Sequence, residues 1–210
     1  IQLTGPTDDA QTRDDNGSLS EFVYGRLRAA LMRAEFAPHQ RLKVRDLAQR
    51  MGTSETPVRE ALFQLAHEGA IEIKPRYYIR VRRLTLAEYL EIKDIRLQLE
   101  PLAAERALPF ITDADIEMLS AEHERLVVAE ASGNWRTALQ ANFNFHFGLF
   151  TRSNMPTLIE VLEGLWIRIG PLLSELYPDA HPTYAERHQH LNVLDALRSR
   201  DSYALREAIR

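Results

Sequence analysis

The stretch from Ser54 to Gly69, SETPVREALFQLAHEG, constrains the fold more than any other part of the chain. Ser54 or Thr56 can cap a helix, and Pro57 suits a first helical turn. Apolar residues then recur at helical spacing until Gly69 ends the pattern: Val58, Leu62, Leu65 and Ala66. Just upstream, residues 42–52 carry a second apolar stripe that ends at Gly52. The sequence therefore predicts two short helices joined by a tight turn.

A small hairpin is expected directly after these helices. Residues 71–73 alternate as a strand, residues 74–77 break the pattern, and residues 79–81 alternate again. Two helices, a turn and a two-stranded wing make a winged helix-turn-helix. In that fold the second helix of the pair enters the major groove of double-stranded DNA.

This region resembles the N-terminal domain of the GntR family of bacterial transcription regulators. The residues that carry the resemblance are Arg41-Leu42, Asp46-Leu47-Ala48, Met51-Gly52, Ser54, Thr56 to Leu62, Leu65 and Glu68-Gly69. The resemblance implies a dimeric repressor or activator whose second domain binds a small effector.

The charge of the chain is unevenly divided. The net charge is -4, yet residues 22–84 contain 13 Lys and Arg against 6 Asp and Glu, whereas residues 85–210 contain 12 against 19. A basic part joined to an acidic part is the asymmetry expected when the basic part binds the phosphates of a nucleic acid. Without cysteine, a membrane-length apolar run or a secretory leader, we expect a cytoplasmic protein with no membrane partner.

Three regions are predicted along the chain. Residues 1–18 are polar and lack an apolar period, which predicts a disordered arm. Residues 19–84 form the DNA-binding domain, opening with a supporting helix near Leu19. Residues 85–210 show helical periods over 86–108, 113–131, 134–152, 156–176, 183–199 and from 201 onward, with no alternating strand pattern. The expected fold is mainly α, a winged helix-turn-helix followed by an all-α bundle.

The resemblance places the DNA contacts at Arg45, Ser54, Glu55, Thr56 and Arg59. Arginine can bind a guanine edge or a phosphate, and hydroxyls at a helix N-terminus can reach phosphate. A salt bridge from Arg59 to Glu55 or Glu60 is the structural alternative. Arg76 and Tyr77 are expected to contact DNA from the wing, where a bulky residue replaces the usual glycine of the family. Tyr78 is expected either beside them or packed inward.

Glu55 departs from the family, which usually has an arginine there that binds guanine. A carboxylate can accept from cytosine N4 but cannot donate to guanine. We therefore expect an operator that differs from the common family site at this step. Glu55→Arg should shift the preference towards guanine in a selection from random duplexes, and an unchanged site would contradict this.

Residues 85–210 resemble the FCD effector domain of the FadR subgroup of this family. The resemblance lies in residues 91–100, in Asn142 to His146 with Ser153-Asn154, and in residues 186–190 leading to 194–197. Many such domains hold a divalent metal through an Asp and a His one turn apart and two later histidines. The matching residues here are Asn142, His146 and His190, and the third histidine would fall beyond Arg210.

Asn142 in place of Asp makes the implied set more positive, which favours an anionic effector, and Zn or Ni is the expected metal. The alternative is that His146 and His190 are hydrogen-bonded polar residues without a metal. By helical geometry His188 lies about 200° from His190 and is expected outside the site. His123, His181 and His67 are interpreted as surface or capping residues.

Arg96 lies in an apolar helical stretch, where a cation requires a partner. By resemblance it binds an effector carboxylate, with Asn142 also lining the pocket; pairing with Glu100 is the alternative. Two copies are needed to place two recognition helices one DNA turn apart, so a homodimer is expected. The rival classes are a metal-dependent enzyme and a ligand-free architectural DNA-binding dimer. No catalytic motif accompanies the histidines, so we expect no enzyme and assign no catalytic residue.

Overall fold

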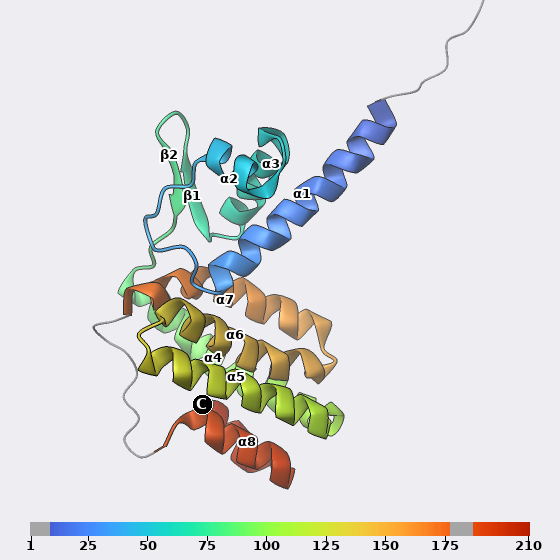
Figure 1. The fold of residues 1–210 in the computed structure, drawn as a ribbon, viewed down its shortest axis with the longest axis vertical. Helices are drawn as coiled ribbons and strands as arrows, with labels where there is room; N and C mark the ends of the chain where they lie inside the picture. The colour runs from blue at the N-terminus through green and yellow to red at the C-terminus, as the bar shows by residue number, and fades with distance from the viewer. Residues whose placement is uncertain (1–8, 177–186) are drawn as a thin grey trace, which may run out of the picture.

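The computed structural model describes residues 9–176 and 187–210, with side chains at residues 19–175 and 187–210. A winged helix-turn-helix lies at one end and a helical bundle at the other (Figure 1). The predicted mainly α fold is thereby confirmed. The described elements are α1 (Asp9–Met32), α2 (Val44–Met51), α3 (Glu55–His67), β1 (Ile71–Lys74), β2 (Tyr78–Val81), α4 (Leu86–Ala107), α5 (Asp113–Ala131), α6 (Trp135–Phe150), α7 (Pro156–Leu176), α8 (Gln189–Ser199) and α9 (Ser202–Ile209), with 3₁₀ turns at Leu108–Phe110 and Thr151–Ser153.

The helix pair α2 and α3 forms as the apolar spacing predicts. Val58, Ala61, Leu62 and Leu65 of α3 are buried against α1 and α2. Gly52 ends α2 in the left-handed conformation, with φ of 65°, and its N–H donates to the carbonyl of Ala48. A side chain at this φ is strained, so glycine suits the turn between the two helices.

The wing is an antiparallel hairpin in which Ile71 pairs with Val81 and Lys74 with Tyr78. The chain before α2 adds to it, because the Leu42 N–H donates to the Ile79 carbonyl at 2.8 Å and the Val81 N–H to the Gln40 carbonyl at 3.0 Å. These bonds fix the position of the hairpin beside the helix pair.

The bundle begins at Thr85, whose side chain caps α4 in a reciprocal capping box with Glu88. Thr112 and Asp115 start α5 in the same way. α6 packs against α5, and its buried face includes Phe143, Phe145 and Phe147. Within the described residues, no helix combines the length and apolarity that a membrane crossing requires.

Helix α1 connects the two halves. It packs against α3 of the winged domain and against α7 of the bundle (Figure 1). Leu27 and Leu31 of α1 are buried. The contact with α7 is close at Gly170, where an added Cβ would lie 2.3 Å from the Leu31 carbonyl oxygen. Arg28 of α1 pairs with both Glu68 and Glu163, so a single side chain contacts both domains.

One predicted helix start differs from the structure, and another lies outside the described residues. Helix α1 begins at Asp9 rather than near Leu19, so part of the expected disordered arm is helical; residues 1–8 lie outside the described residues. Extending an existing helix costs far less than starting one, which explains how a polar stretch without an apolar period continues it. Helix α8 begins at Gln189, and the predicted start at 183 lies outside the described residues.

Candidate functional site

The N-terminal end of α3 presents the predicted recognition residues to solvent. Ser54, Glu55, Thr56 and Arg59 are all exposed, as is Arg45 of α2. Ser54 occupies the N-cap position, but its hydroxyl makes no capping bond. The exposed hydroxyl and the helix N-terminus can therefore both face an anion.

Arg59 is not independent of Glu55. Its guanidinium donates to the Glu55 carboxylate at 2.6 Å, one helical turn away, and both side chains are about half exposed, at 56% and 47%. Of the two partners considered for the structural alternative, Glu55 is the one that Arg59 contacts. Because exposed ion pairs are weak, a phosphate can compete for the arginine.

The wing places a second group of polar residues beside α3. Arg76 lies at the turn with φ of 66°, and Tyr77 is 72% exposed. A cavity of about 340 Å³ separates this turn from α3 and is lined in part by Arg59, Phe63 and Lys74. Tyr78 is half-buried, and the Arg80 guanidinium lies 4.3 Å from the centre of its ring. The wing tip and the start of α3 therefore border one basic groove.

Inside the bundle, His146 of α6 faces His190 of α8. Their Nε2 atoms are 3.4 Å apart, and the Phe145 ring stacks on His190 with a centroid distance of 3.7 Å. Asn142 is half-buried one turn before His146. The predicted histidine pair is thus brought together.

Burial keeps these imidazoles neutral, the form that binds metals. Desolvation lowers the pKa of His146 to about 4 and also lowers the pKa of His190. The Nδ1 atoms of both rings are buried and have no hydrogen-bond partner among the described residues. Two ligand atoms of one tetrahedral ion lie roughly 3.4 Å apart, so His146 and His190 fit the metal that the family resemblance implies.

Arg96 adopts the pairing that was left open as the alternative. Its Nε donates to the buried Glu100 carboxylate at 2.6 Å, and the Trp166 Nε1 donates to the same oxygen at 2.7 Å. The Arg96 guanidinium also lies 4.5 Å from the centre of the Trp166 ring. The cation is therefore already matched by a carboxylate inside the bundle.

Two histidine predictions are wrong. His123 is buried, with 7% of its surface exposed, rather than a surface residue. His188, expected to point away from His190, lies 4.4 Å from it between ring centroids. Helical geometry does not apply to His188, because this residue precedes α8 as its N-cap and its Nδ1 accepts from the His190 N–H. Of the other two histidines, His67 is exposed as expected, and His181 lies outside the described residues.

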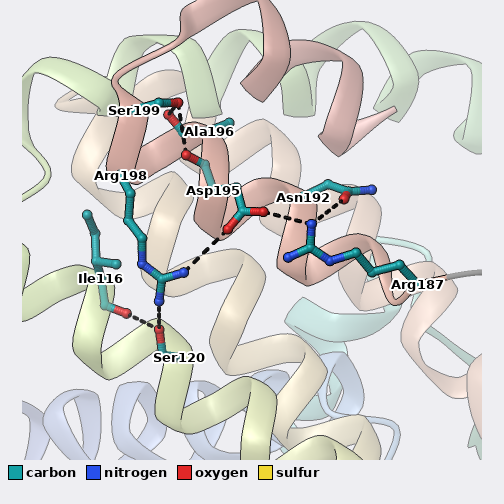
Figure 2. Close-up of polar contacts among 8 residues, drawn as sticks. All are labelled: Ile116, Ser120, Arg187, Asn192, Asp195, Ala196, Arg198 and Ser199. Carbon is teal, nitrogen blue, oxygen red and sulfur yellow. Dashed lines mark hydrogen bonds and ion pairs between the residues drawn. The ribbon is translucent and has the colours of Figure 1, made fainter.

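A polar network joins α8 to α5 and to Arg187, which lies just before α8 (Figure 2). Asp195 pairs with Arg187 at 2.7 Å and with Arg198 at 3.5 Å. Arg198 in turn donates to the Ser120 hydroxyl of α5 at 3.2 Å. This network could not be found from periodicity, since it joins residues far apart in the chain.

Comparisons with known proteins agree with this architecture. Residues 19–81 match the model for bacterial regulatory proteins of the gntR family, and residues 91–210 match the FCD domain. The HTH-type transcriptional regulator McbR of Escherichia coli (strain K12) is 33% identical over 196 residues, which cover 91% of this chain and 88% of McbR. The HTH-type transcriptional repressor RspR of the same organism is 25% identical over 191 residues, covering 91% of this chain and 84% of RspR.

A solved structure of E. coli McbR/YncC superposes with a TM-score of 0.83 at 32% identity, covering 91% of each chain. Both the sequence and the fold therefore match a regulator over nearly the whole length of the described chain. This chain belongs to the gntR family of bacterial regulatory proteins, carries an FCD domain and is a transcription regulator rather than an enzyme.

Proposed function

We propose that this chain binds a palindromic operator as a homodimer and that a small carboxylate in the helical bundle controls its affinity for DNA. The observation that carries the proposal is the exposed start of α3, where Ser54 and Thr56 face solvent and Arg59 lines a cavity together with the basic turn of the wing. The backbone N–H groups at the start of α3 and the nearby cations can donate hydrogen bonds to phosphate oxygens and to base edges.

Each contact has a role in this proposal. Arg45 and Arg76 bind phosphates, because both are exposed cations, Arg45 on α2 and Arg76 at the turn of the wing. Ser54 and Thr56 donate to phosphate at the helix N-terminus, and Glu55 accepts from a cytosine amino group. Arg59 leaves Glu55 for the DNA, and Tyr77 contacts the sugar-phosphate backbone from the wing.

The geometry of DNA recognition supports the proposed homodimer. A single recognition helix contacts only one half-site, and two helices one DNA turn apart require two copies. Leu86 and Leu90, one turn apart on α4, are 72% and 44% exposed, which is the kind of surface that a second copy would cover. Sedimentation analysis of Leu90→Glu against the unchanged chain tests this, with a shift to monomer expected.

The effector is proposed to bind near Arg96, where Trp166 and His146 also lie. Its carboxylate would take the place of Glu100 on the guanidinium. A divalent ion, Zn or Ni, is proposed with His146 and His190 as nitrogen ligands and Asn142 as an oxygen ligand. Bound there, the ion would supply a positive centre for an anionic ligand.

The route from bundle to DNA is proposed to pass through α1. Arg28 pairs with Glu163 of α7 and with Glu68 directly after α3, and Tyr24 also donates to Glu68. A shift of α7 on effector binding would therefore move α1 and, with it, α3. We also place the chain in the cytoplasm, where its DNA partner is found.

A two-step experiment tests the proposal. A thermal-shift screen of carboxylic acids and sugar acids identifies ligands of the full chain, and fluorescence anisotropy with a selected operator duplex then measures DNA affinity with and without each hit. We expect a ligand-dependent change in affinity that Arg96→Met abolishes. Stabilising ligands that leave DNA affinity unchanged would contradict the proposed control, and turnover of a hit would favour an enzyme.

A further inference from the structure

A second set of nitrogen atoms lies beside the His146–His190 pair. His123 of α5, His188 before α8 and His190 in the first turn of α8 each offer one ring nitrogen, and these three atoms lie within 4.8 Å of one another. We propose that His123, His188 and His190 bind a divalent transition-metal ion of the zinc class without needing His146. This inference does not rest on DNA binding or on the effector.

The three rings are already grouped closely enough for a shared ion. The centroid of His123 lies 4.8 Å from that of His188 and 5.7 Å from that of His190. Nitrogen ligands on a tetrahedral zinc ion are roughly 3.4 Å apart, at a bond length of about 2.1 Å. The three ligand atoms lie within 4.8 Å of one another, so they would have to approach by up to about 1.4 Å when an ion binds.

Two of the three histidines are buried and have ring nitrogens that an ion could bind. His123 and His190 are 7% and 4% exposed, and the Nδ1 atom of each is buried with no hydrogen-bond partner among the described residues. Buried polar atoms are normally paired, because an unpaired one forfeits its bond to water. A metal ion would restore an electron-pair acceptor to these nitrogens.

The surroundings hold the third ligand in place. The Nδ1 of His188 accepts from the His190 N–H at 3.1 Å, which fixes the ring, so its Nε2 is the nitrogen that would bind the ion. The adjacent Arg187 pairs with Asp195, and Arg198 joins α8 to Ser120 of α5 (Figure 2). The two elements that supply the ligands are therefore tied together before any ion binds.

The donor set selects the class of ion. Three imidazoles and no carboxylate suit zinc, nickel or copper and disfavour magnesium and calcium, which prefer oxygen ligands. Since the ligands are neutral, the full charge of the ion remains, and a fourth position is left for water or an anion. The ion would cross-link α5 to the start of α8, and it should stabilise the folded chain by mass action.

The test uses the metal-free full chain carrying His146→Gln, which removes the other histidine pair. This chain is titrated with Co²⁺ while its ligand-field absorption is recorded, and Zn²⁺ content is measured by elemental analysis after gel filtration. We expect about one ion per chain with tetrahedral-type bands. Adding His123→Gln or His188→Asn should weaken Co²⁺ binding by about tenfold or more.

The variants are chosen to separate ligand loss from misfolding. Asn keeps an N-cap acceptor at the start of α8, so His188→Asn removes the imidazole and leaves the helix capped. His67→Gln on the exposed end of α3 is the control and should bind Co²⁺ like its parent. Melting in chelator checks that each variant folds. If His146→Gln alone abolishes binding, or if neither added substitution weakens it, the proposed site is wrong.

Discussion

At the scale of single residues, the arginines proposed to contact DNA are held by local structure. Arg59 is exposed at the start of α3, yet its guanidinium is held by Glu55 at 2.6 Å. Arg76 occupies a left-handed backbone conformation at the wing turn, which costs an L-residue about 1 kcal/mol. Both positions were predicted from the sequence as DNA contacts, and this stays a prediction. The Arg59–Glu55 ion pair was one of two pairings that the sequence left open. The positive φ of Arg76 could not be predicted from the sequence.

Glu55→Gln should raise DNA affinity. The substitution removes a negative charge that phosphate repels, and Arg59 no longer has to leave an ion pair to bind DNA, while the glutamine amide oxygen can still accept from cytosine. The DNA-binding surface therefore gains one net positive charge, so we expect the slope of log affinity against log salt to steepen by about one unit. Fluorescence anisotropy over a KCl series measures this. Glu207→Gln is the matched control, because Glu207 of α9 pairs with Arg210 in the bundle domain. This substitution should leave the slope unchanged. Equal slopes for Glu55→Gln and the parent would contradict the role given to Glu55.

At the scale of elements, α1 and α7 form the joint between the two domains. The backbones approach so closely at Gly170 that a methyl group would meet the Leu31 carbonyl, whereas nothing lies within 4 Å of a Cβ added at Gly164 of the same helix. A side chain would therefore clash at Gly170 and fit at Gly164, although the sequence alone does not distinguish the two glycines.

Alanine substitutions at these glycines should change stability in opposite directions. Gly164→Ala should stabilise the fold by up to about 1 kcal/mol, because alanine loses less backbone entropy in a helix. Gly170→Ala should destabilise it by about 1–3 kcal/mol, because the joint must open to admit the methyl group. Urea unfolding monitored by circular dichroism measures both. Equal stabilities for the two variants would show that the joint is looser than described.

The pair of His146 and His190 makes the stability of α6 and α8 dependent on pH. Burial lowers the pKa of His146 to about 4, while an unfolded histidine titrates near its usual pKa of about 6.5. Between these values the unfolded chain binds a proton that the folded chain does not, so stability is complete above pH 6.5 and is lost as pH falls towards 4.

In metal-free protein, His146→Gln should therefore lose less stability on acidification than the parent. The difference between pH 7 and pH 5 should shrink by up to about 2 kcal/mol, as judged from urea unfolding at both values. His67→Gln changes an exposed histidine and should keep the drop of the parent. An equally large drop in the His146 variant would mean that its ring is not buried in the neutral form.

At the scale of the whole molecule, the mainly α fold and the family were predictable because they depend on local patterns. The spacing of Val58, Leu62 and Leu65 and the glycines at 52 and 69 determine the helix pair, and each appears directly in the sequence. The gathering of His123 and His188 around His190 was not predictable. It depends on how α5 packs against α8 and on where α8 begins, which no periodicity reports.

The dependence on packing also explains why only some contacts inside the bundle could be predicted from the sequence. The i,i+4 spacing of Asn142 and His146 predicted that both lie on one face of α6. The resemblance to the FCD domain predicted that His190 faces them, and the structure places His190 beside His146. The match of Arg96 with Glu100 was foreseen only as an alternative, because the buried contact with Trp166 joins α4 to α7. Long-range pairs of this kind are decided by tertiary packing rather than by spacing along the chain.

The most direct test of the central claim, that the basic winged domain binds duplex DNA, is a salt series of anisotropy titrations with a selected operator duplex. Arg45→Ala should reduce the magnitude of the salt slope by about one unit. Arg125→Ala, which removes an exposed arginine of α5 in the bundle, should leave the slope unchanged. If the parent chain fails to bind duplex DNA even at low salt, or if the Arg45 and Arg125 variants behave alike, the account of the DNA-binding surface is wrong.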